Sequence, residues 1–253
     1  AFQRDRAYAT EVYRQVAEMF DGANLSIQHV ISEGSVGESI VNKAAEIDAD
    51  LIVLGARGHS QISRLLLGSI SDHVATHAPC STLIVRPTGL KETVRPIRVC
   101  LAYENSPSAV AALDEISEIP WRTGTEFHLL SIETYLSDFI GQRVSEEELD
   151  LSAHAEEALL LAVERLQHVA PSATTHLLKS DHIGEGVVGF AERNAIDLVI
   201  VGETPRSALN RFLLGSTSRF VLRHAPCSVW LTRNQVAKSL GAVERRMEHD
   251  HSG

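Results

Sequence analysis

The glycine residues between positions 55 and 68 have a spacing that suits a phosphate group. Gly55 and Gly58 are separated by two residues, and Gly68 and Ser69 follow after nine more. Glycine has no Cβ, so it permits a tight turn and lets a ligand approach the backbone. A helix that begins at Gly68–Ser69 would present free N–H groups and a positive dipole end to an anion. The spacing predicts a phosphate site, although Ser69 with Asp72 also fits a simple helix cap.

Neighbouring side chains could complete this site. Arg57 and His59 could neutralise phosphate charge, although exposed loop cations are common, and Ile70 belongs to the same candidate set. We find no nucleophile–base pair, no metal-ligand spacing and no pair of carboxylates suited to hydrolysis. We therefore assign no catalytic residue and no metal site.

The elements that position these residues belong to a sequence repeat with a period of 147 residues. Constant spacing across three segments indicates a tandem duplication rather than chance. The matching segments are Asp50–Gly55 with Asp197–Gly202, Leu66–Ser69 with Leu213–Ser216, and His77–Ser81 with His224–Ser228.

The repeat divides the chain into a first unit, residues 1–87, and a second unit, residues 97–233. Residues 234–253 read as a flexible tail. The second unit opens at the apolar run Ile97–Tyr103, whose counterpart would lie before the first residue. We therefore expect the first unit to lack about its first 50 residues.

Strands alternate with helices in both units, which indicates an α/β fold built on an open parallel sheet covered on both faces. Five strands are expected in the second unit, at Ile97–Tyr103, Glu126–Ile132, Thr174–Leu178, Asp197–Val201 and Ser228–Thr232. The first unit begins inside a long helix whose apolar residues run from Tyr8 to Phe20. An edge strand is expected at Leu25–Ile31 and a central strand at Leu51–Leu54.

Composition limits the partners. Of 253 residues, 23 are Lys or Arg and 33 are Asp or Glu, which gives a formal net charge of −10. Such a surface repels nucleic-acid phosphates and anionic lipids, so we exclude nucleic acid and membranes as partners. Three scattered cysteines form no disulfide framework, and neither a signal peptide nor a membrane-spanning run is recognisable. We expect a cytoplasmic protein.

The glycine pattern and its surroundings resemble the universal stress protein family, whose motif G-x-x-G, nine residues, G-[S/T] matches Gly55, Gly58, Gly68 and Ser69. The resemblance extends over both units and identifies the chain as a tandem member with a truncated first domain. It implies two tandem Rossmann-like domains similar to adenine nucleotide α-hydrolases, each with an open five-stranded parallel sheet. It also implies that ATP, with or without Mg²⁺, binds beside the glycine motif.

The second unit departs from the family motif. Pro205 stands where the motif has its second glycine, and proline has neither an N–H group nor access to positive φ. Glu104 replaces the aspartate with which the family's first strand usually ends. We therefore expect a weakened or lost site in the second unit. Its weaker candidate residues are Glu104, Ile132, Gly202, Gly215 and Ser216.

The sequence is compatible with three functions. The first is an ATP-binding regulatory stress-response protein whose bound nucleotide sets a conformation that an unknown protein partner reads. The second is an interaction scaffold without nucleotide, in which the two units form an intramolecular pseudo-dimer through their last strands. A homodimer is an alternative use of those strands. The third is slow ATP hydrolysis or autophosphorylation at Ser69 or Ser71.

Overall fold

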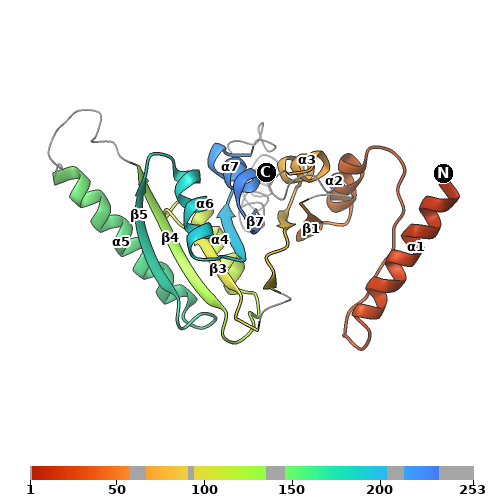
Figure 1. The fold of residues 1–253 in the computed structure, drawn as a ribbon, viewed down its shortest axis with the longest axis horizontal. Coiled ribbons are helices and arrows are strands. Elements are labelled where there is room, and N and C mark those ends of the chain that lie inside the picture. The colour runs from red at the N-terminus through yellow and green to blue at the C-terminus, as the bar shows by residue number, and fades with distance from the viewer. Residues whose placement is uncertain (1, 57–66, 91–93, 135–145, 204–213, 234–253) are drawn as a thin grey trace, which may run out of the picture.

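A computed structural model describes residues 2–56, 67–90, 94–134, 146–203 and 214–233 (Figure 1). The first unit contains α1 (Phe2–Met19), α2 (Val36–Glu46), β1 (Leu51–Gly55), α3 (Ser69–His77) and β2 (Ser81–Val85). The second unit contains β3 (Arg98–Ala102), α4 (Pro107–Ser117), β4 (Glu126–Thr134), α5 (Glu146–Leu166), β5 (Thr174–Ser180), α6 (Ile183–Arg193), β6 (Leu198–Gly202), α7 (Ser216–His224) and β7 (Ser228–Thr232). The proposed tail at 234–253 lies outside the described residues.

The second unit has the five-stranded parallel sheet expected from its sequence. Its strands lie in the order β7-β6-β3-β4-β5, and every neighbouring pair is parallel. The helix that follows the first strand, α4, begins where Ser106 caps it and Pro107 occupies its first turn. Ser106 Oγ accepts a hydrogen bond from the N–H of Ala109 at 3.3 Å. Proline suits this place because its missing N–H would have no partner inside the helix.

The two units share one continuous sheet. Strand β2 pairs with β7 in antiparallel register, with Leu83 opposite Trp230, so the order becomes β1-β2-β7-β6-β3-β4-β5. Figure 1 shows the strands of the first unit continuing the sheet of the second. The last strands of the two units were expected to be edges available for pairing, and here they pair with each other.

Two predictions about the first unit are wrong. The segment Leu25–Ile31 forms no strand, and β1 is an edge strand rather than a central one. One face of β1 is uncovered, so Leu51 is 38% and Val53 56% exposed. Helix α1 forms where the apolar periodicity predicted it, but it stands apart from the sheet in Figure 1, and Tyr8 is 59% exposed. Among the described residues, no strand lies on the outer side of β1 to support the predicted arrangement.

Helices cover both faces of the second unit's sheet. One face packs Leu101, Leu129 and Ile200 against α4 and α5, and the other packs Val199 and Val229 against α6 and α7. The cysteines belong to the core, as expected from the sequence. They are Cys80, Cys100 and Cys227, all buried, and burial raises the pKa of the Cys227 thiol to about 12.

A reciprocal pair of arginines ties the units together. Arg86 follows β2, and its Nη2 donates to the carbonyl oxygen of Leu222 in α7 at 2.6 Å. Arg233 follows β7, and its Nη2 donates to the carbonyl oxygen of Ala75 in α3 at 2.7 Å. These residues lie at equivalent positions of the repeat, so the junction has approximate twofold symmetry. Each arginine satisfies carbonyl groups at a helix C-terminus, where a cation is also favoured by the dipole.

The backbone N–H groups of both arginines are bonded in the same reciprocal way. Arg86 N donates to Ser228 Oγ at 3.1 Å, and Arg233 N donates to Ser81 Oγ at 2.7 Å. Ser81 Oγ in turn donates to the buried Glu115 carboxylate at 3.0 Å. The junction is therefore a polar network enclosed by strands and helices from both units.

Replacing Arg233 by alanine should destabilise the whole sheet. The carbonyl oxygens of Ala75 and Ala78 would lose their donor inside the junction. An unpaired buried polar group costs about 1–3 kcal/mol, so we expect Arg233→Ala to lower the free energy of unfolding by about 2–4 kcal/mol. Urea unfolding measures this change. Arg122→Ala, at an exposed position, is the control and should stay within about 0.5 kcal/mol of the native chain.

Two histidines at the edge of the second unit's sheet contact each other. His128 Nδ1 lies 3.1 Å from His176 Nε2, and Thr174 Oγ1 lies within hydrogen-bonding distance of both rings. Burial lowers the pKa of both histidines, and the charge of His176 lowers that of His128 further. Glu126 opposes the shift at His128, while Arg98 adds to it. The folded chain therefore favours the neutral form of both rings.

Acidification should weaken the fold through these histidines. As pH falls below about 6.5, the unfolded chain takes up protons that the folded chain resists, so the free energy of unfolding decreases. The decrease should end once the pH is below the lowered pKa values of the folded state. Urea unfolding between about pH 7.5 and pH 5 measures the slope, at most about 1.4 kcal/mol per pH unit for each histidine. A His128→Gln/His176→Gln variant should show a flatter profile, and an equally steep one would contradict the assignment.

Candidate functional site

In the first unit, the end of β1 and the start of α3 are held together. Gly68 N donates to the carbonyl oxygen of Ala56 at 2.8 Å, and Ser71 Oγ donates to that of Gly55 at 2.8 Å. Ser71 is buried by this contact. The N-terminus of α3 therefore lies at the carboxyl end of the sheet, where ligands bind in open α/β folds.

Gly68 is the N-cap of α3, so Ser69 is its first helical residue. The alternative interpretation of Ser69 and Asp72 as a capping box is not borne out, because α3 has no side-chain cap and Asp72 forms an ion pair with Arg223 of α7 at 3.1 Å. Ser69 and Ile70 are exposed in the first turn, where backbone N–H groups have no partner within the helix. The remaining candidates of this unit, Arg57, Gly58 and His59, lie outside the described residues.

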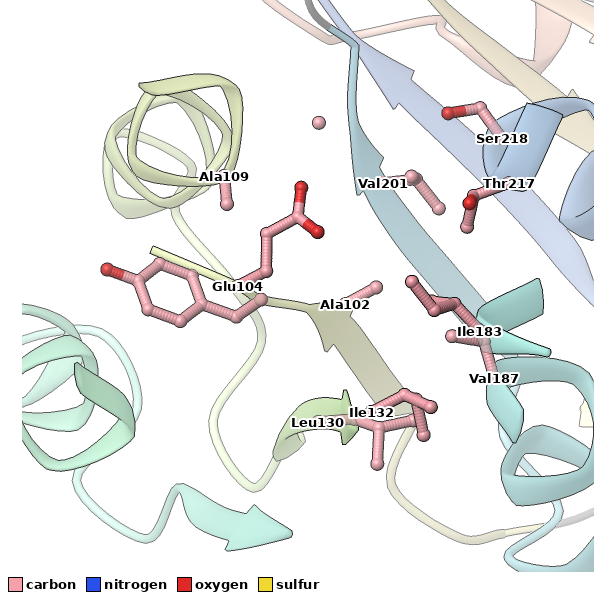
Figure 2. Close-up of a pocket in the computed structure, with 12 residues that line it drawn as sticks. Ala102, Glu104, Ala109, Leu130, Ile132, Ile183, Val187, Val201, Thr217 and Ser218 are labelled. Carbon is pink, nitrogen blue, oxygen red and sulfur yellow. The ribbon is translucent and has the colours of Figure 1, made fainter. Parts of the chain in front are cut away.

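The second unit has a pocket of about 90 Å³ at the carboxyl ends of β3, β4 and β6 (Figure 2). Three of the predicted residues, Glu104, Ile132 and Gly202, line it. The Glu104 side chain reaches from the end of β3 toward the space between Ala109 and Val201 (Figure 2). Most of the other lining residues are apolar: Ala102, Ala109, Leu130, Ile183, Val187 and Val201, with Tyr103, Thr217 and Ser218. Its volume is small beside the roughly 300–1,000 Å³ of typical ligand pockets.

The remaining predicted residues of the second unit, Gly215 and Ser216, lie beside this pocket at the start of α7 rather than in its lining. Thr217 and Ser218 line it instead. Gly202 is required where β6 passes α4, because a Cβ there would lie 2.3 Å from the carbonyl oxygen of Ser108. This glycine thus serves packing as well as the pocket.

Sequence reasoning missed Glu203, which directly follows β6. Its Oε1 accepts a hydrogen bond from the N–H of Gly215 at 3.0 Å, and the residue is only 7% exposed. The carboxylate therefore lies at the N-terminus of α7. Burial lowers the pKa of Arg233, and the negative charge of Glu203 opposes that shift.

The repeat itself carried the signal for this residue. The position equivalent to Glu203 in the first unit is Ala56, whose side chain bears no charge. The two helix N-termini consequently differ in the side chain that follows the preceding strand.

Within the described residues, no group of three or more His, Cys, Asp or Glu side chains could hold a metal ion. No helix in the same part of the chain is long and apolar enough to span a membrane.

An α/β fold is thus present, with Gly55 and Gly68 of the glycine pattern at the carboxyl end of β1. The family model described as the universal stress protein family matches residues 2–86 and 97–233. The chain therefore belongs to the universal stress protein family, as its glycine pattern indicated.

Individual relatives share only part of the chain. A putative universal stress protein of Staphylococcus haemolyticus is 28% identical over 96 residues, which cover 37% of this chain and 58% of that protein. A putative universal stress protein of Staphylococcus aureus is 31% identical over 96 residues with the same coverage. The chain thus spans less than two thirds of the length of these relatives.

Solved structures of similar fold cover most of the chain. A universal stress protein from Archaeoglobus fulgidus covers 92% of this chain and 78% of its own, with a TM-score of 0.61 at 20% identity. A putative universal stress protein from Pseudomonas aeruginosa covers 92% of this chain and 82% of its own, with a TM-score of 0.65 at 14% identity. At these identities the likeness concerns the fold alone.

Substitutions at two glycines should have unequal effects on stability. In Gly202→Ala the new Cβ would meet the backbone of Ser108, which cannot move without displacing α4, so we expect a loss of about 3 kcal/mol or more. In Gly215→Ala the nearest atom is the Glu203 Oε1, 3.2 Å away on a flexible side chain, so the loss should stay below about 1.5 kcal/mol. Urea unfolding of both variants tests the difference, and equal losses would contradict the close approach at Gly202.

Proposed function

We propose that the protein is a cytoplasmic, ATP-binding regulator of a stress response, with its nucleotide site in the first unit and a degenerate site in the second. Bound ATP, with or without Mg²⁺, would stabilise a conformation that a protein partner recognises. Family membership supports the class of protein, and the glycine motif supports the ligand.

The observation that carries this proposal is the contact between β1 and the start of α3. The hydrogen bonds from Gly68 to Ala56 and from Ser71 to Gly55 hold the strand end against the helix N-terminus. The first-turn N–H groups and the helix dipole then favour an anion, and glycines on the intervening loop would let phosphate oxygens approach the backbone. A site of this kind tolerates the net charge of −10, because its donors are local backbone groups.

We infer a binding role rather than turnover. Of the two serines considered for modification, Ser71 is buried and its hydroxyl donates to the Gly55 carbonyl oxygen, whereas Ser69 is exposed. ATP would therefore act as a bound effector, with at most slow hydrolysis.

The alternative function is an interaction scaffold that uses no nucleotide. The antiparallel pairing of β2 with β7 favours it, because this pairing and the reciprocal arginines organise both units without a ligand. In that case an intramolecular pseudo-dimer would present docking surfaces to its partner. Measurement of bound nucleotide distinguishes the two functions.

The protein, purified at its native length, should release about one ATP per chain on denaturation. Gly58 and Pro205 occupy equivalent positions of the repeat, so Gly58→Pro gives the first unit the proline of the second. The substitution also removes a backbone N–H donor. We expect it to weaken Mg-ATP binding at least tenfold, as measured by isothermal titration calorimetry. Pro205→Ala, the matched change in the second unit, should leave affinity and stoichiometry unchanged. Absence of both released nucleotide and titration heat would leave the scaffold function.

A further inference from the structure

We propose that Glu203 determines the ligand specificity of the second unit, by placing a carboxylate of the chain beside the helix N-terminus that would otherwise attract a phosphate group. The second unit would then exclude nucleoside polyphosphates because of this side chain, independently of Pro205. The inference rests on the proposed function for the class of ligand, an anionic phosphate. It concerns a different unit and a residue outside the glycine motif.

The position of Glu203 carries the inference. The residue follows β6 directly, and the hydrogen bond of its N–H to the carbonyl oxygen of Thr232 anchors its backbone beside β7. Its side chain is folded inward, so that Oε1 accepts the N–H of Gly215 at 3.0 Å. A Cβ added at Gly215 would lie 3.2 Å from the same oxygen, which shows how closely the carboxylate approaches the helix start.

The electrostatics of this contact explain the exclusion of phosphate. The N-terminus of α7 offers a partial positive charge and donors with no partner inside the helix, which favour one nearby anion. Glu203 supplies that anion from inside the protein, with the cationic Arg233 close enough to be affected by its charge. A polyphosphate would have to approach this carboxylate in a partly desolvated site, where like charges repel strongly.

The first unit provides the comparison. At the equivalent position it has Ala56, and Gly68 N donates to the backbone carbonyl oxygen of Ala56 rather than to a carboxylate. The helix starts at the same place in both units, with glycine as the N-cap and serine as the first residue. The two helix N-termini therefore share a backbone frame but differ in charge. Glu203 stands beside α7 where Ala56 stands beside α3, and the first turn of α3 has Asp72, paired with Arg223, where α7 has Arg219.

The test separates the effect of the Glu203 charge on Mg-ATP binding from the effect of Pro205. Pro205→Gly serves as the reference, and Glu203→Gln/Pro205→Gly and Glu203→Ala/Pro205→Gly are compared with it. Glutamine keeps the size of the side chain and an acceptor for Gly215, but it removes the charge. Mg-ATP titrations are followed by the NMR shifts of the Gly215 and Ser216 amides, which report on the second unit alone.

We expect the Pro205→Gly chain to bind Mg-ATP weakly at the second unit. Both double variants should bind there at least tenfold more tightly. Affinities in both double variants that equal the reference would overturn the inference. Should Glu203→Ala prevent folding, seen as loss of dispersed amide signals, the isosteric Glu203→Gln variant decides the question.

A reciprocal substitution tests the same idea in the first unit. Ala56→Glu should weaken binding there at least tenfold, as followed by the Gly68 and Ser69 amides, and unchanged affinity would count against the inference. Failure of the proposed function can be distinguished from failure of this inference. In that case Mg-ATP would not shift the Gly68 and Ser69 amide signals of the native-length protein. The variants of Glu203 would still decide the inference at Gly215 and Ser216.

Discussion

The antiparallel pairing of β2 with β7 is the interaction on which the rest of the structure depends. It converts the sheets of two units into one, and it brings Arg86 and Arg233 to the helix C-termini of the opposite unit. Buried carbonyl groups need donors, and the arginines supply them across the junction. The first unit contributes only two strands to the described sheet, so its order relies on this contact with a complete neighbour.

The same junction connects helices α3 and α7 of the two units. The C-termini of α3 and α7 face the junction, where an arginine of the other unit donates to carbonyl groups of each helix. The ion pair between Asp72 and Arg223 adds a direct link between these two helices. A ligand that moved either helix would therefore disturb hydrogen bonds made by the other unit.

The surroundings of these two helix N-termini differ in charge and in backbone chemistry. The first unit combines a complete glycine set with the uncharged Ala56, whereas the second combines Pro205 with the buried carboxylate of Glu203. Its pocket of about 90 Å³ is formed by a complete set of strands but is mainly apolar. Duplication thus preserved the frame of the fold while substitutions next to the strand ends changed the chemistry.

The sequence by itself determined the family, the two units and the strands of the second unit, because these depend on local periodicity and on a repeat that is visible in the residues. Of the weaker candidates that the sequence offered in the second unit, Glu104, Ile132 and Gly202 line one pocket, whereas Gly215 and Ser216 lie beside it. Only the tertiary structure decided that β1 is an edge strand, that residues 25–31 form no strand, and that Glu203 reaches Gly215. All three features depend on contacts between residues far apart in the chain. Such contacts decide which strands pair and which side chains are buried, and local sequence patterns do not specify them.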